Sequence, residues 1–142
     1  MDEHEIFQVG QKAVVMHDGK CLVMESSWKP GLWDLPGGRI NRGEDGDRAF
    51  RRELEEEAGI QDFLTLGVVD YDVWMRTDKM PILLVAQLLE CKSAAVTLSH
   101  EHSAFRWVTL QELEGYPFVW PTLKRMIKNG FRLYELLRNK NE

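Results

Sequence analysis

The sequence predicts an α/β fold, in which short strands alternate with one central and one terminal helix. An Asp-Gly dipeptide at residues 18–19 separates two apolar runs, a strong signal for a two-residue β-hairpin. Good helix formers occupy most of residues 45–58, and Gly59 follows them where a helix ends in the left-handed conformation. Residues 120–137 repeat apolar side chains at mostly helical spacing. Helices of this kind bury one face, so we expect them to pack against a sheet built from the strands.

The first third of the chain is expected to form a hairpin, a loop and a short strand. The hairpin strands are predicted at residues 11–17 and 20–25. Residues 26–31 (SSWKPG) are polar and broken by proline, which indicates an exposed loop. Residues 32–35 predict a short strand, which runs into residues 36–38 (PGG), where paired glycines favour a tight turn.

Beyond the central helix, the chain is expected to supply three more strands and two helices. Thr109 and Glu112 form a capping-box pattern that opens a short helix. Gly130 predicts a break in the terminal helix, and residues 138–142 are expected to fray. The strands are predicted at residues 64–74, 80–89 and 105–108, and the helices at residues 110–113 and 120–137.

Length and composition indicate one globular domain over residues 1–142, since a chain that is 44% hydrophobic can bury a core. A net charge of −5 argues against a nucleic-acid-binding surface, which needs basic side chains. The N-terminus lacks the pattern of a secretory signal, and the longest apolar run, residues 82–89, is too short to cross a bilayer. We therefore expect a cytoplasmic protein with no membrane partner, in which Cys21 and Cys91 are free structural thiols.

The central helix places three carboxylates on one face. At about 100° per residue, Glu53, Glu56 and Glu57 fall within an arc of roughly 100°. Like-charge pairs three and four residues apart each cost roughly 0.2–0.5 kcal/mol, and these lie toward the negative end of the helix dipole. A bound divalent cation would relieve this repulsion, and oxygen ligands suit Mg²⁺ or Mn²⁺. The alternative interpretation is a solvated acidic surface.

The spacing around this helix resembles the Nudix hydrolase signature G-x5-E-x7-R-E-U-x-E-E-x-G-U, in which U is a bulky aliphatic residue. Every defined position is occupied, and the matching residues are Gly38, Glu44, Arg52, Glu53, Leu54, Glu56, Glu57, Gly59 and Ile60. The preceding segment, GLWDLPGG, is also similar to the lead-in found in family members. The resemblance implies the Nudix fold, a mixed β-sheet sandwiched between α-helices (α/β/α).

The resemblance also implies a metal-dependent hydrolase that cleaves a nucleoside diphosphate linked to a moiety X, by attack of water on phosphorus. Mg²⁺ is the expected cofactor, with Mn²⁺ as an alternative. Arg52 would orient the glutamates by pairing with them, and Glu53 would be either a ligand or the general base. The implied metal ligands are the backbone carbonyl of Gly38 and the carboxylates of Glu53, Glu56, Glu57 and Glu101.

Several candidates lie outside the signature. Glu101 is similar to a loop glutamate that supplies a further carboxylate in many family members; the alternative is an exposed side chain. His100 and His102 flank it, and either is an idle exposed side chain or a general acid or base. The other candidates are expected to contact substrate, the aromatic ones by stacking on a base and the arginines by binding phosphate. These are Trp28, Trp120, Arg39 and Arg76.

Small size and the GLWDLPGG lead-in favour a nucleoside triphosphate as substrate. One alternative is a catalytically silent Nudix-fold nucleotide sensor or interaction module, which would not need the complete set of carboxylates. Another is an RNA 5′-end pyrophosphohydrolase, which the acidic net charge disfavours. A homodimer is compatible with the sequence, which does not determine the oligomeric state.

Overall fold

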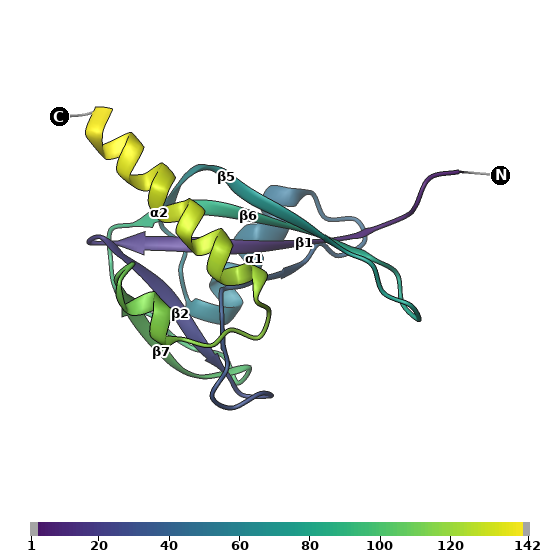
Figure 1. Ribbon diagram of the computed structural model, residues 1–142, viewed down its shortest axis with the longest axis horizontal. Helices are drawn as coiled ribbons and strands as arrows, with labels where there is room; N and C mark the ends of the chain where they lie inside the picture. Colours follow the sequence, from purple (N-terminus) through teal and green to yellow (C-terminus); the bar gives the residue numbers. More distant parts are fainter. Residues whose placement is uncertain (1–2, 141–142) are drawn as a thin grey trace.

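The computed structural model describes residues 3–140 and contains a seven-stranded mixed sheet (Figure 1). The strands are β1 (Gln8–His17), β2 (Lys20–Ser26), β3 (Trp33–Asp34), β4 (Gly37–Arg39), β5 (Phe63–Trp74), β6 (Ile82–Cys91) and β7 (His102–Val108). The order along the sheet is β3-β2-β1-β6-β5, and in addition β4 pairs with β1 and β7 with β2. β1 runs parallel to β6, whereas the other pairings are antiparallel.

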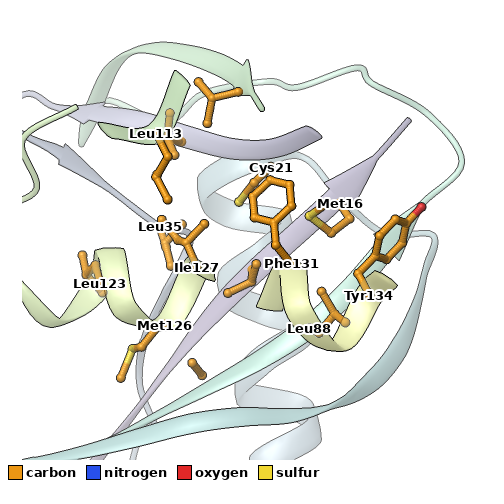
Figure 2. Packing of buried hydrophobic residues seen from close by; sticks show 14 of the residues in the cluster. Met16, Cys21, Leu35, Leu88, Leu113, Leu123, Met126, Ile127, Phe131 and Tyr134 are labelled. Carbon is orange, nitrogen blue, oxygen red and sulfur yellow. The ribbon is translucent and has the colours of Figure 1, made fainter. Parts of the chain in front are cut away.

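The two long helices cover opposite faces of this sheet, α1 (Gly46–Ala58) on one side and α2 (Thr122–Lys140) on the other (Figure 1). Alternate residues of β1 separate the two cores, because successive side chains of a strand point to opposite faces. Val14 packs with residues of α2, whereas Val15 packs with residues of α1. Figure 2 shows the α2 side, where Ile127 and Phe131 lie among buried side chains of the strands. The predicted sandwich of helices around a mixed sheet is confirmed.

Local signals in the sequence correctly placed several elements. Asp18 and Gly19 both have positive φ, as the tight hairpin turn between β1 and β2 requires. The Asp45 side chain accepts a hydrogen bond from the Arg48 N–H at 2.9 Å and caps α1, which ends at Gly59 with φ 67°. The capping box is also present, since Thr109 and Glu112 each bond the other's backbone N–H.

Several boundaries differ from the predictions. The paired glycines predicted as a tight turn instead form the short strand β4, and the strand predicted at 105–108 begins at His102. The short helix is a 3₁₀ turn, η1 (Glu112–Gly115), two residues later than expected. Residues 138–140 are helical and not frayed, because α2 continues to Lys140; residues 141–142 lie outside the part that the structure describes.

The predicted break at Gly130 is wrong, because α2 continues through it without interruption. Gly130 lies against Val14 of β1, and a Cβ placed on this glycine would lie 2.6 Å from Val14 Cγ1. The glycine therefore allows α2 to approach the sheet closely and does not interrupt the helix.

Both cysteines are buried and free, as predicted for structural thiols. Within residues 3–140, no helix is long and apolar enough to cross a membrane.

We predict that Gly130→Ala destabilises the protein although alanine favours helices. Overpacking against Val14 costs about 1–3 kcal/mol, and the helix propensity of alanine returns about 1 kcal/mol of this. Chemical denaturation should show a net loss, and a double-mutant cycle with Val14→Ala should show favourable coupling. Gly115→Ala is the control, since its Cβ would meet nothing within 4 Å. A more stable Gly130→Ala would contradict the packing explanation.

Candidate metal and substrate site

Glu57 is a buried carboxylate near the end of α1, with 7% of its surface exposed. The Gly37 N–H of β4 donates a hydrogen bond to Glu57 Oε2 at 2.6 Å. Burial raises the pKa of Glu57 to about 8, although the charge of Lys12 and the Gly37 hydrogen bond both act in the opposite direction. A buried carboxylate of this kind gains most from a nearby cation.

The close approach of β4 to β1 makes this contact possible. β1 pairs with β2 only beside the hairpin turn, and further along it pairs with β4, where Lys12 lies opposite Gly37. Gly37 has φ 140°, and a Cβ there would lie 2.0 Å from the Gln11 carbonyl oxygen. Only glycine fits at this position, so the sequence of β4 determines where the N–H for Glu57 is presented.

Arg52 holds three carboxylates through one guanidinium group. Its Nε and Nη2 donate to the two oxygens of Glu44 at 2.6 and 2.8 Å. Its Nη1 donates to Glu53 at 2.9 Å and to Glu56 at 3.3 Å. The Arg52 hydrogen bonds lower the pKa of Glu44 to about 2, so this carboxylate remains charged. The structure thus pairs Arg52 with the signature glutamates, in the way the family resemblance implied.

Glu53 packs directly against the backbone of Gly38. A Cβ at Gly38 would lie 2.6 Å from Glu53 Oε1, so any larger residue there would force this carboxylate to move. Burial raises the pKa of Glu53, while Arg52 acts against that shift and the charges of Glu56 and Glu101 add to it. The carboxylates of this region therefore influence one another electrostatically.

Glu101 and His102 join Glu57 from a different part of the chain. One ligand atom from each of the three residues lies within 4.8 Å of the others. Glu101 is exposed and lies just before β7, and its carbonyl accepts a hydrogen bond from the Ser27 N–H at 2.9 Å. His102, expected in a loop, is the first residue of β7 and is 7% exposed.

The side chains of this group fit a divalent cation. Two carboxylates converge there, and burial lowers the pKa of His102, which favours a neutral ring that can offer a lone pair. His102 Nδ1 is buried, and no hydrogen-bond partner for it lies within residues 3–140. Neither Glu53 nor Glu56 belongs to this set of converging atoms in the described structure; Arg52 holds both beside it.

Sequence reasoning missed Lys12 and Asp34, which form a buried ion pair next to this group. Lys12 is 6% exposed, and its Nζ donates to Asp34 Oδ1 at 3.0 Å and to the Leu35 carbonyl at 3.1 Å. The same ammonium lies 5.1 Å from the centre of the Trp120 ring, a cation–π distance. The available signal was a lysine directly before the apolar run of residues 13–16 in the first strand.

The four predicted substrate residues occupy different surroundings. Trp120 packs edge-on against Trp74 at 4.3 Å between ring centres, and both line a pocket of about 440 Å³. Trp28 is 74% exposed, in the loop whose Ser27 bonds the Glu101 backbone.

The two predicted phosphate-binding arginines, Arg39 and Arg76, differ in how they are linked to the signature carboxylates. Arg39 is an exposed residue of β4, and its carbonyl accepts a hydrogen bond from Arg52 Nη2 at 3.4 Å. Arg76 donates to the Met80 carbonyl in the β5–β6 loop. Within residues 3–140, no hydrogen bond or ion pair joins Arg76 to the signature carboxylates.

Comparisons with known proteins agree with this architecture. The model of the NUDIX domain matches residues 7–129. The nucleoside triphosphatase NudI of Escherichia fergusonii is 34% identical over 130 residues, covering 82% of this chain and 92% of the relative. NudI of Escherichia coli O139:H28 is 30% identical over 134 residues, with the same coverage.

Solved structures are similar over nearly the whole chain. The solution structure of the E. coli ORF135 protein has a TM-score of 0.76 and 26% identity, covering 92% of each chain. A MutT protein from Methanosarcina mazei Go1 has a TM-score of 0.71 and 24% identity, covering 92% of this chain and 97% of that one.

We predict that Glu57→Gln stabilises the metal-free protein at neutral and higher pH. Because folding raises the pKa of Glu57 from an ordinary value near 4.5 to about 8, its stabilising contribution is complete below about pH 4 and is lost as pH rises through 8. Denaturation of the metal-free proteins should show equal stabilities at pH 4 and a gain for the variant on the order of 3 kcal/mol at pH 8. A wild-type stability that does not fall relative to the variant over this range would contradict the burial of a protonatable Glu57.

Proposed function

The chain belongs to the Nudix hydrolase family, and we propose that it is a Mg²⁺-dependent enzyme that hydrolyses the phosphoanhydride chain of a nucleoside triphosphate. The observation that carries this proposal is the convergence of Glu57, Glu101 and His102 beside the carboxylates held by Arg52. The relatives named nucleoside triphosphatases support the substrate class. Mn²⁺ is the alternative ion, because carboxylate and imidazole ligands suit it as well.

In this proposal the carboxylates of Glu57 and Glu101 and the imidazole of His102 would hold the ion. Further ligands would come from the carboxylates of Glu53 and Glu56 and the carbonyl of Gly38. When bound, Mg²⁺ polarises phosphoryl oxygens and offsets the negative charge that develops on them. Arg52 is a positioning residue, since its guanidinium keeps Glu53 and Glu56 from turning away from one another. The Gly37 N–H holds the Glu57 carboxylate in place by donating a hydrogen bond to it.

The reaction also requires an acceptor for one proton of the attacking water. The water oxygen forms a bond to phosphorus, the anhydride P–O bond breaks, and a general base takes the proton. Glu53 and Glu101 are the carboxylate candidates for this general base, and a histidine beside Glu101, His100 or His102, is the alternative acceptor. The raised pKa of Glu53 brings it nearer to neutrality, whereas the exposed Glu101 can exchange its proton directly with solvent.

The nucleoside would be bound by aromatic side chains in this proposal. Trp120 lies beside the buried Lys12 ammonium and lines the pocket next to Trp74, and exposed Trp28 extends from the loop next to Glu101. Indole rings stack on bases at about 1–3 kcal/mol each. Arg39 and Arg76 would contact phosphates, for which a guanidinium offers two parallel donors.

We predict that purified protein with Mg²⁺ releases phosphate or pyrophosphate from at least one nucleoside triphosphate in a panel that also contains nucleotide sugars and dinucleotides. Turnover should stop on exhaustive chelation and return with Mg²⁺ or Mn²⁺. Glu57→Gln keeps the Gly37 acceptor but removes a charge, and it should reduce turnover by at least about a hundredfold while remaining folded. Full activity of this variant at saturating Mg²⁺ would refute the proposed site.

We predict a separate effect for Glu101→Gln, measured as rate against Mg²⁺ and against pH. If Glu101 is a ligand, kcat should fall and the half-saturating Mg²⁺ concentration should rise, because one anionic donor is lost. If it is the general base, the rate should fall with little change in metal requirement, and the acidic limb of the pH profile should shift. Glu135→Gln, an exposed glutamate of α2, is the matched control. A Glu101→Gln variant equal to the control in both titrations would exclude Glu101 from the site.

A further inference from the structure

The β5–β6 hairpin leaves part of one face uncovered. On the side of α2, alternate residues of β6 from Leu84 to Leu88 belong to the main core. The intervening β6 residues point to the other face, and so do the β5 residues paired with them, since directly paired residues share a face. Val68, Tyr71 and Val73 of β5 lie opposite Gln87, Val85 and Leu83 of β6.

Helix α1 covers only the far end of this second face. The core cluster around α1 includes Leu89 and Cys91 of β6, and Phe63 of β5 packs against it. The β5 and β6 residues that pair nearer the hairpin loop do not belong to this cluster. Figure 1 shows the hairpin extending beyond both helices. The uncovered surface, called here the hairpin face, consists of Val68, Tyr71, Val73, Met75, Leu83 and Val85.

This surface is strongly exposed for apolar side chains. Val68 is 61% exposed, Tyr71 65% and Val73 43%. Met75, which continues the alternation just past the end of β5, is 65% exposed. Contiguous apolar patches of this kind on a folded protein mark interaction sites.

The hairpin face carries no charge. The two acidic residues of β5, Asp70 and Asp72, belong to the opposite side, where Arg125 bonds Asp70 and Thr122 bonds Asp72. β5 contains no lysine or arginine, although exposed edge strands commonly carry such residues as protection against pairing. The molecule has a net charge of −5, so this neutral surface is where two copies can approach without bringing like charges together.

The outer edge of β5, by contrast, is closed to a further strand. The Tyr71 N–H donates to Asp70 Oδ1 at 2.8 Å, and the Val73 N–H donates to Asp72 Oδ1 at 2.9 Å. Arg125 Nη2 donates to the Tyr71 carbonyl at 3.2 Å. Side chains therefore occupy the backbone groups that an added strand would need, and association by extension of the sheet is disfavoured.

We propose that the hairpin face is a homodimer interface, in which two copies stack their β5–β6 hairpins face to face about a two-fold axis. A neutral, apolar surface offers no charge that its own copy would repel, so it can meet that copy across a two-fold axis. Its exposed side chains amount to an area on the order of 500 Å² per copy, and the combined area of about 1,000 Å² lies at the lower limit for a specific interface. The dimer is therefore expected to be weak, with a dissociation constant on the order of 10 µM.

Sedimentation velocity on the full chain tests this proposal. Protein concentrations from about 1 to about 200 µM lie below and above the expected dissociation constant. Wild type should pass from monomer to dimer as concentration rises. Tyr71→Lys and Val73→Lys each place like charges across the two-fold axis and should weaken dimerisation at least tenfold, with unchanged thermal midpoints. The control is Leu64→Lys on the same strand, 61% exposed but paired with Glu90 on the α2 side, which should dimerise like wild type.

Three results would overturn the proposal. The first is a wild type that stays monomeric throughout this range. The second is a dimer that persists in folded Tyr71→Lys or Val73→Lys, which would place the contact elsewhere. The third is equal loss of the dimer in Leu64→Lys, which would mean that any added charge on the strand disrupts association.

Discussion

The hydrogen bond from the Gly37 N–H to the buried Glu57 carboxylate is the contact on which the site depends. It joins β4, in which only glycine fits at position 37, to the last turn of α1, whose apolar face packs in the core on its own side of the sheet. Lys12 fixes the same segment from the other side by bonding the Leu35 carbonyl and Asp34. Because the backbone of β4 is paired with β1, the carboxylate cannot move toward solvent without losing its hydrogen bond to the Gly37 N–H.

Arg52 resolves the electrostatic conflict that the helix creates. Glu53 and Glu56 lie on one face with Glu57, and each would repel the others if no cation intervened. A single guanidinium bonds two of them and also Glu44, which belongs to the loop before the helix. The loop is thereby tied to α1, so the same ion pairs that hold the acidic side chains also fix the approach of the chain to the helix.

The sequence was sufficient for every strand except β4, for both long helices and for the carboxylate face, because each rests on local periodicity, turn chemistry or capping. Glu57 and Arg52 could be singled out because the spacing of the signature identified them. It was insufficient for Lys12 and Asp34, which lie 22 residues apart and meet only because β3 pairs with β2 and β4 pairs with β1. The burial of His102 could not be predicted for the same reason, since it depends on the pairing of β7 with β2.

Gly130 shows how a local rule fails when tertiary packing decides. Glycine weakens an isolated helix, which motivated the predicted break, yet this glycine is retained within a continuous helix at the point where α2 contacts β1. The volume of the Val14 side chain on β1 determines which residue fits at position 130. The sequence neighbours of Gly130 carry no information about Val14. The same holds for Gly37 and Gly38, whose requirement arises from neighbours far away in the chain.

The two buried cysteines have a chemical consequence. Burial raises the pKa of Cys21 to about 12 and that of Cys91 to about 11, so almost no thiolate forms at neutral pH. Only the thiolate reacts readily with peroxide or with a disulfide, which makes sulfenic acid formation and mixed disulfides slow at both positions. A hydrolase with this fold can therefore keep its thiols intact through oxidising episodes without a resolving cysteine or a reductase devoted to it.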